Sequence, residues 1–250
     1  SYVPVSKPSE RILIDDSNQD DDFDMKNTRN DFKESFDSDA FHKANVGDVF
    51  SMGIIDGLDV FWKVLDIDNE DGSKLIISKD VIDVKSLIEL DDIKPRGCVA
   101  WKDSKLRKWL NSKFMEVMIP DVIHSKIKKV ILSNKKFKHK NVNDNQDSDL
   151  NDTSDSIFCL SVEEAEKYFG SNQDRMALAT DYANSKVKCY AYRHFKNENT
   201  GGVKWWLRDS NFGAFRANYN VVDGDGSISD YQLWSSAEGV GVRPAMWIKL

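Results

Sequence analysis

The C-terminal stretch, residues 205–250, constrains the fold of this chain more than any other part of the sequence. It holds four of the seven tryptophans and carries a short apolar run near each end, Trp205-Trp206-Leu207 and Met246-Trp247-Ile248. Apolar runs of this length, bounded by turn residues, are typical of buried strands. The residues between the two ends are rich in Gly, Ser, Asn and Asp, which favour turns and loops. We therefore expect packed strands at both ends and a polar, loop-rich surface between them.

The bulk properties of the chain argue against several classes of partner and cofactor. A chain of 250 residues can bury one sizeable core. The net charge of −7 and the pI of about 5.2 argue against nucleic acid or anionic lipid as the main partner. No apolar run is long enough to span a membrane. Cys98, Cys159 and Cys189 lack the spacing of a zinc site or a disulfide framework. We expect no metal and no cofactor.

Residues 1–45 differ in composition from the rest of the chain. Ten acidic side chains lie between residues 15 and 39, with few aliphatic ones. Such a segment buries too little apolar surface to offset the entropy of ordering it. We therefore expect a flexible acidic tail or linker over 1–45 and a single domain over 46–250. The alternative is a short helix that docks on the domain, because the spacing of Phe32, Phe36 and Phe41 allows one.

Strand and helix patterns in the first part of the domain predict a mixed fold. Residues 49–55, 58–67 and 74–78 are expected to be strands, with Asp71-Gly72 in the turn before the third. Residues 104–118 are expected to form a helix, capped by Asp103 or Ser104, because apolar residues recur at helical spacing. This stripe consists of Leu106, Trp109, Leu110, Phe114 and Val117.

Two further segments have clear signatures. Ser161-Val162-Glu163-Glu164 is a capping box, which predicts a helix running to residue 169. Residues 124–140 carry seven lysines around an apolar strand pattern. A nucleic-acid surface would need arginines and stacking rings, and only Phe137 could stack on a base. We interpret this segment as a solvated strand and expect no nucleic-acid partner.

Four ordered motifs resemble those of a bacterial domain family of unknown function. They are Trp101, Ser104, Leu106-Arg107 and Trp109-Leu110-Asn111; then Phe158-Cys159-Leu160-Ser161; then Trp205 to Ser210; and finally Gly241 to Ile248. Asp209-Ser210 stands where that family has Ser-Pro, a difference that we expect to matter little. The family is distantly similar to the C-type-lectin-like fold, in its formylglycine-generating-enzyme-like branch.

The resemblance carries expectations about fold and location. It implies an α+β domain with a small antiparallel sheet, two main helices and long polar loops, whose first and last strands pair. Because members often occur in exported proteins, it also implies an extracellular or cell-surface location in a bacterium.

Catalysis is not favoured by the residues present. Oxidation of the formylglycine-generating type needs a cysteine pair in the C-terminal third, and the last cysteine of this chain is Cys189. The four histidines, His42, His124, His139 and His194, show no spacing that pairs a nucleophile with a base. We therefore expect a non-catalytic module. An enzyme of unrecognised type and a structural domain of a larger assembly are the alternatives.

The loop-rich surface of residues 210–239 is the expected binding site for a glycan or protein ligand. Aromatic rings beside Asn, Ser and Gly supply contact area at low entropic cost. The candidate ligand-binding residues are Asn211, Arg216, Asn218, Tyr219, Tyr231 and Trp234. The alternative is that the aromatic ones face inward from strands. Asp223 and Asp225 form a weak candidate calcium site, and the turn of a β-hairpin explains the same residues more simply.

The tryptophans and arginines of the motifs are expected to be architectural. A strand arginine aligned with an indole usually stacks on it and pairs with a carboxylate, although anion binding is the functional alternative. The structural residues that we predict are Trp109, Trp205, Trp206, Arg208, Arg243 and Trp247.

Overall fold

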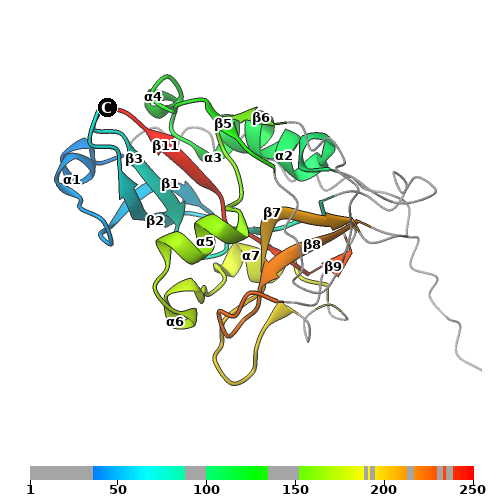
Figure 1. Ribbon diagram of the computed structural model, residues 1–250. Helices are drawn as coiled ribbons and strands as arrows, with labels where there is room; N and C mark the ends of the chain where they lie inside the picture. The colour runs from blue at the N-terminus through cyan, green and yellow to red at the C-terminus, as the bar shows by residue number, and fades with distance from the viewer. Residues whose placement is uncertain are drawn as a thin grey trace, which may run out of the picture.

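A computed structural model of the chain describes residues 36–87, 100–134, 152–188, 191, 195–212, 217–229, 233–234 and 239–250. Within these residues it has two larger sheets, a two-stranded ribbon and several short helices (Figure 1). The expected α+β class is confirmed at this level. The expected single small sheet and two main helices are fewer elements than the described residues contain, because the strands divide between two larger sheets, each with strands from both halves of the chain.

The first sheet is made by the N-terminal hairpins and completed by the C-terminus. β1 (Val49–Ile55), β2 (Leu58–Ile67), β3 (Lys74–Ser78) and β11 (Ala245–Ile248) lie in this order, all antiparallel. Val64 pairs with Ile76, and Ile76 with Met246, and all three are fully buried. The three strands predicted over 49–55, 58–67 and 74–78 are confirmed.

The expected pairing of the first and last strands is wrong. β11 pairs with β3, while β1 lies at the opposite edge of the sheet. The physical reason is the length of the two turns. The turns at 56–57 and 68–73 are short, so β1, β2 and β3 are neighbours in sequence order. The free edge of β3 is then available to the C-terminal strand.

The second sheet contains β4 (Asp83–Val84), β10 (Gly241–Val242), β7 (Trp205–Phe212), β8 (Ala217–Val222) and β9 (Leu233–Trp234), in this order. β10 runs parallel to β7, so this sheet is mixed. The segment from β10 to β11 therefore passes from one sheet into the other. Gly241 permits this crossing, because a Cβ atom there would lie 2.4 Å from Cγ1 of Val81.

The helix predicted over 104–118 is confirmed, with an irregularity inside it. It follows a single 3-10 turn, η4 (Trp101–Asp103). It consists of α2 (Lys105–Trp109), a π-helical turn η5 (Leu110–Phe114) and α3 (Met115–Met118). Ser104 is the N-cap, because its hydroxyl accepts the N–H of Arg107 at 3.1 Å.

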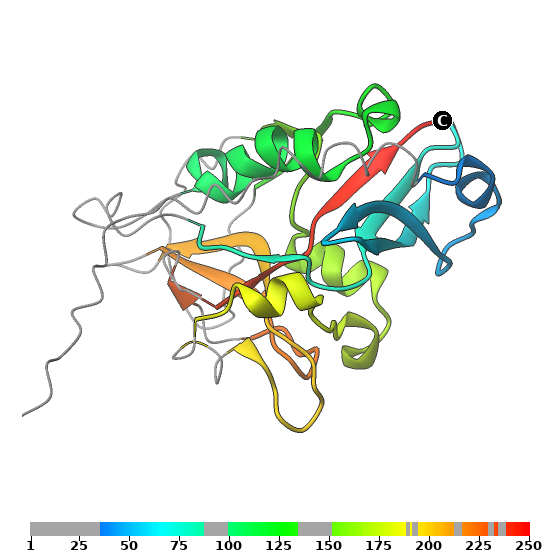
Figure 2. The same cartoon turned by 180° about the vertical axis from the view of Figure 1, so that it is seen from behind.

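Four short helices and a ribbon follow along the chain (Figure 2). They are α4 (Asp121–His124), α5 (Val162–Tyr168), α6 (Asn172–Arg175), α7 (Asp181–Ser185), and the antiparallel strands β5 (Val130–Leu132) and β6 (Thr153–Asp155). The predicted capping box at the start of α5 is present. Ser161 accepts the N–H of Glu164, and Glu164 accepts the N–H of Ser161.

The domain begins before residue 46. α1 (Ser38–Lys43) packs on the first sheet, and Phe41 is 2% exposed with its ring centroid 5.4 Å from that of Phe50. The ammonium of Lys74 donates to the carbonyls of Phe41, His42 and Ala44 at 2.5, 3.0 and 2.6 Å. The tail boundary at residue 45 is therefore wrong for residues 36–45, because an aromatic anchor and a buried cation hold them. Residues 1–35 lie outside the described part of the chain.

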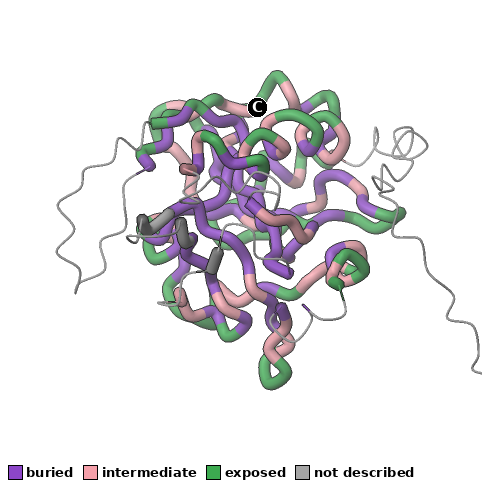
Figure 3. The backbone as a smooth tube through the Cα atoms, turned by 90° about the vertical axis from the view of Figure 1, so that its right-hand side faces the viewer, coloured by how far each residue is buried: buried purple, intermediate pink, exposed green. Residues whose placement is uncertain are grey.

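One continuous core joins the two sheets. Figure 3 shows buried backbone running through the middle of the molecule, with exposed segments around it. Buried residues of the first sheet, the α2–η5 helix and the second sheet belong to the same cluster, among them Ile76, Leu110, Trp205 and Val242. None of the helices in the described part of the chain is long and apolar enough to cross a membrane.

Candidate functional site

The helix motif holds a buried strand in place. Asn111 uses its whole side-chain amide, since its oxygen accepts the N–H groups of Ser156 and Ile157 at 2.8 and 3.1 Å. Its nitrogen donates to the carbonyls of Arg107 and Ile157 at 3.0 and 2.8 Å. Such a complete set of bonds fixes the backbone that leads from β6 toward α5. These contacts are architectural.

The fully buried carboxylate of Asp155 also holds this backbone in place. It accepts from the Arg107 guanidinium at 2.6 Å, from the Trp101 indole at 3.0 Å and from the Thr153 hydroxyl at 2.8 Å. A buried charge is tolerated when it is paired and hydrogen-bonded in this way. Trp101, Arg107 and Asn111 of the motif thus position the segment 153–157.

Arg208 joins β7 to α5 through the capping box. Its guanidinium makes a two-pronged ion pair with Glu164, one arm at 2.9 Å, and also donates to the carbonyl of Cys159 at 3.1 Å. Glu164 therefore serves both as the capping-box acid and as the partner of a buried arginine. The pairing of Arg208 with a carboxylate matches its predicted architectural role.

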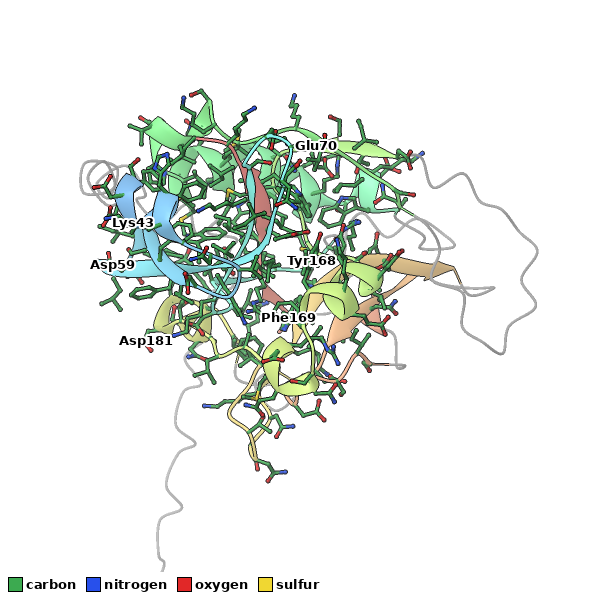
Figure 4. The ribbon with its side chains drawn as sticks, turned by 60° about the vertical axis from the view of Figure 1, so that its left-hand side comes forward. Lys43, Asp59, Glu70, Tyr168, Phe169 and Asp181 are labelled. Atoms are coloured by element: carbon green, nitrogen blue, oxygen red, sulfur yellow. The ribbon has the colours of Figure 1, made fainter. Side chains whose placement is uncertain are left out.

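Arg243 is buried without a carboxylate partner among the described residues. Its guanidinium donates to the carbonyls of Ser78, Arg175 and Lys79 at 2.8, 3.2 and 3.0 Å. It lies 5.0 Å from the ring of Trp205 and 5.2 Å from that of Phe169, which is labelled near the centre of Figure 4. Burial lowers its pKa to about 10. The expected carboxylate is replaced by three carbonyls, while the expected indole contact is present.

The other predicted structural tryptophans are also packed. Trp205 and Trp206 are fully buried, and their indole N–H groups donate to the carbonyls of Arg175 at 3.2 Å and Lys85 at 2.7 Å. Trp109 and Trp247 are partly buried and pack against the core. Each has a lysine ammonium over its ring, Lys85 at 4.6 Å and Lys128 at 5.8 Å.

An irregularity in β7 creates a buried polar cluster that no sequence pattern indicated. Trp206 pairs with Val221 and Ser210 with Tyr219, so residues 207–209 of β7 lie opposite the single residue Asn220 of β8. Extra residues in one strand of a pair form a bulge, which turns backbone groups away from the ladder. Here the N–H of Arg208 donates instead to the carbonyl of Leu160 at 2.9 Å.

Asp209 is the electrostatically unusual member of this cluster. Its carboxylate is buried and accepts the N–H of Val162, the first residue of α5. Burial raises the pKa of Asp209 to about 6, although the Val162 N–H and the nearby Arg208 act to lower it. The only sequence signal was the Asp-Ser that replaces the family's Ser-Pro at this point, a difference expected to matter little.

Asn220 lies opposite the bulge, and the hydrogen-bonding capacity of its side chain is not fully satisfied. It is 4% exposed, and its amide nitrogen has no hydrogen-bond partner among the residues that the structure describes. The same holds for Nε of Arg208. Buried donors of this kind are uncommon in native proteins. No sequence pattern distinguished Asn220 from its neighbours Asn218 and Asn211.

Three candidate ligand residues are brought together by strand pairing. Asn211 of β7 pairs with Asn218 of β8, and Asn218 pairs with Trp234 of β9. Directly paired positions lie on the same face of a sheet, so the three residues form a row across the strands. Arg216 and Tyr231 lie outside the described residues.

The expected surface position of Tyr219 is wrong. Tyr219 is fully buried, and its ring centroid lies 6.3 Å from that of Trp206. It neighbours Asn218 and Asn220 in sequence, so it lies on the opposite face of β8 from them. The alternative prediction, that aromatic residues of this segment face inward from strands, therefore holds for Tyr219. Tyr219 is no longer a candidate ligand-binding residue.

Asp223 and Asp225 lie in a hairpin turn. Val222 bridges to Ile228, and the N–H of Asp223 donates to the carbonyl of Ser227 at 2.8 Å. Asp225 accepts from the N–H and hydroxyl of Ser227 at 2.9 and 2.6 Å, and these bonds lower its pKa. Asp223 is paired with Lys204 at 2.9 Å. The described residues contain no group of three or more His, Cys, Asp or Glu side chains placed to hold a metal ion.

The thiol and imidazole groups of the described residues are not arranged for nucleophilic chemistry. Cys159 is fully buried, and burial raises the pKa of its thiol to about 12. The imidazole of His124 is hydrogen-bonded to the carbonyl of Ile119 at 2.8 Å, and that of His42 to the carbonyl of Ser38 at 2.7 Å. The remaining candidates, Cys98, Cys189, His139 and His194, lie outside the described residues.

Comparison with known proteins identifies a family and nothing finer. No curated protein and no solved structure matches the chain. Residues 71–250, well over half of the chain, match the family described as Domain of unknown function (DUF6273). The match includes all four motifs and every residue of the polar cluster at the β7 bulge. The chain therefore belongs to the DUF6273 family.

Proposed function

We propose that this protein is a non-catalytic recognition module that binds a glycan or protein ligand through the surface of residues 210–239. The single observation that carries the proposal is the row of Asn211, Asn218 and Trp234 at directly paired positions of three adjacent strands. Amide side chains donate to and accept from hydroxyl and carbonyl groups, and an indole offers a flat apolar ring for stacking. This combination suits a sugar ring or a peptide surface.

The position of the row supports access by a large ligand. β9 is the last strand of the second sheet among the described strands, so the row ends at a sheet edge. Asn220 lies two residues from Asn218 in β8 and therefore shares its face. Its amide nitrogen is buried, so Asn220 is not counted among the proposed contact residues. The wider setting that we propose, the bacterial surface or outside the cell, comes from the family resemblance.

A capture experiment tests the proposal. We would probe glycan and bacterial or host surface-protein arrays with the wild-type chain and with Trp234→Ala and Asn218→Ala. Both variants should lose capture of the same ligands while their melting temperatures stay within about 2 °C of wild type, because a binding residue is not a core residue. Phe61→Ala is the matched control, since Phe61 is an exposed aromatic residue of the other sheet.

Two results would contradict the proposal. Capture that survives both substitutions would show that the row does not contact the ligand. A large fall in the melting temperature of Trp234→Ala, without a separable effect on binding, would show that Trp234 is a core residue. The location is tested independently by asking whether an antibody labels the protein on intact cells.

A further inference from the structure

A basic surface with exposed apolar residues lies away from the surface proposed above. Residues 100–134 contain eight Lys and Arg but three Asp and Glu, whereas the whole chain has a net charge of −7. Ile131 and Val122 are the most exposed large hydrophobic residues in the described part of the chain, at 71% and 61%. Figure 2 shows α2, α3 and α4 along one side of the molecule, drawn in green. We call Val122, Lys126, Lys129 and Ile131 the α4–β5 face.

The backbone of the α4–β5 face is held on both sides. Residues 126–128 run along the outer edge of β11, where Ile127 bridges to Ile248 and the N–H of Lys128 donates to the carbonyl of Trp247 at 2.9 Å. Farther along, Ile131 pairs with Ser154 of β6. The face therefore exists before any partner arrives, and little ordering entropy would be lost on binding.

Two lysines of the face have no counter-ion. Within residues 100–134, Lys128 forms an ion pair with Asp71 at 2.8 Å, and Arg107 forms one with Asp155 at 2.6 Å. The charges of these two residues are therefore compensated within the domain. Lys126 and Lys129 are exposed and make no ion pair with any residue in the described ranges. Along residues 122–131, two unpaired ammonium groups thus lie between two exposed aliphatic side chains in the sequence.

We propose that the α4–β5 face docks an acidic polypeptide segment that also carries aliphatic residues. Carboxylates of the partner complement Lys126 and Lys129, and its aliphatic side chains cover Val122 and Ile131. Nucleic acid fits less well, because the face contains no ring to stack on a base and the arginine of the stretch is held by Asp155. The proposal concerns a different surface from the proposed glycan or protein site and does not depend on it.

The chain itself contains a suitable probe. Residues 10–34 hold nine Asp and Glu together with Ile12, Leu13 and Ile14. We would label a synthetic peptide of this sequence and titrate it with the full chain, following fluorescence anisotropy at low and high salt. Binding should occur at low salt and weaken as the salt concentration rises, because exposed charges are screened.

Substitutions locate the binding. Lys126→Glu with Lys129→Glu should raise the Kd on the order of tenfold or more, and Ile131→Ser should raise it by a smaller factor. The matched control is Lys186→Glu with Lys196→Glu, which changes the net charge equally but lies outside residues 100–134. That control should leave the Kd within about twofold. Melting temperatures verify that each variant is folded.

Several outcomes would overturn the proposal. Because the chain's own residues 10–34 compete with the peptide, the titration is repeated with a full-length variant whose acids in 10–34 are replaced by Asn and Gln. An absence of peptide binding to both proteins at low salt would overturn the proposal. An equal loss in the control variant would also do so, because it would indicate general electrostatic attraction. Equal binding of a peptide with Asn and Gln in place of its acids would show that the lysines are not recognised. Tighter binding of a duplex DNA under the same conditions would assign the face to nucleic acid instead.

Discussion

Replacement of the buried Asp209 by asparagine should stabilise the domain at neutral pH and reduce its pH dependence. The carboxylate accepts the Val162 N–H beside Arg208, and burial raises its pKa from 3.8 to about 6, with Glu164 and Glu163 also raising it. A group whose pKa is raised in the folded state binds its proton more tightly there than in the unfolded chain. Its contribution to stability therefore grows as the pH falls from above 6 toward 3.8.

The magnitude follows from the size of this shift. Each pKa unit is worth about 1.36 kcal/mol, so the shift corresponds to about 3 kcal/mol at pH 7, where Asp209 is charged in both states. An asparagine resembles the protonated carboxyl, because it is neutral and its oxygen can accept the same Val162 N–H. We expect Asp209→Asn to gain about 1–3 kcal/mol at pH 7 and almost nothing near pH 4.

Urea denaturation followed by tryptophan fluorescence at several pH values between 4 and 8 measures this difference. The free energy of unfolding of Asp209→Asn should fall less steeply than that of wild type between pH 4 and pH 7. The matched control is Asp59→Asn, because Asp59 is exposed on β2 and is labelled at the edge of the molecule in Figure 4. An unchanged slope for Asp209→Asn, or a loss of stability at pH 7, would show that burial of this carboxylate does not weaken the domain.

Four further predictions concern the architecture and the hairpin turn. Asn111→Ala should lower the free energy of unfolding by about 2–4 kcal/mol, measured by urea denaturation, because four part-buried hydrogen bonds between its amide and the backbone are lost. Lys74→Met should release α1, seen as faster amide exchange over residues 38–44 with the rest of the domain unchanged, since three carbonyls lose their common donor. Tyr219→Ala should cost about 3–5 kcal/mol in thermal or urea unfolding, whereas an exposed residue at that position would change stability by only a few tenths of a kcal/mol. Calcium or a chelator should leave the melting temperature unchanged, because Asp225 is bonded within its own turn and Asp223 is paired with Lys204; a shift would revive the calcium site.

Helices and turns were predictable because their signals are local. The apolar stripe and the Ser104 cap defined the helix over 104–118, and the Ser161 box defined the start of α5. These features depend on residues within one or two turns of each other. The π-helical turn inside the long helix had no such signal.

The candidate site was only partly predictable. The pattern of residues 210–239 indicated strands with polar and aromatic residues, and the pairing of Asn211, Asn218 and Trp234 agrees with strands there. Alternation shows that a strand has two faces, but it does not show which face is covered. Tyr219 was therefore assigned to the wrong side, and Asp209 and Asn220 were missed because their character comes from burial against other elements.

From the residues alone, the α+β class, the position of the main helix and first strands, and the hairpin at 223–227 could be predicted. The chain also matches the DUF6273 family over residues 71–250. The pairing of β11 with β3, the place of residues 36–45 in the domain and the buried carboxyl of raised pKa at the β7 bulge became visible only in the folded molecule. The difference lies in how far apart along the chain the interacting residues are. Helical periodicity, caps and turns are set by neighbouring residues, whereas strand partners, burial and electrostatics are set by groups that meet only when distant segments pack together.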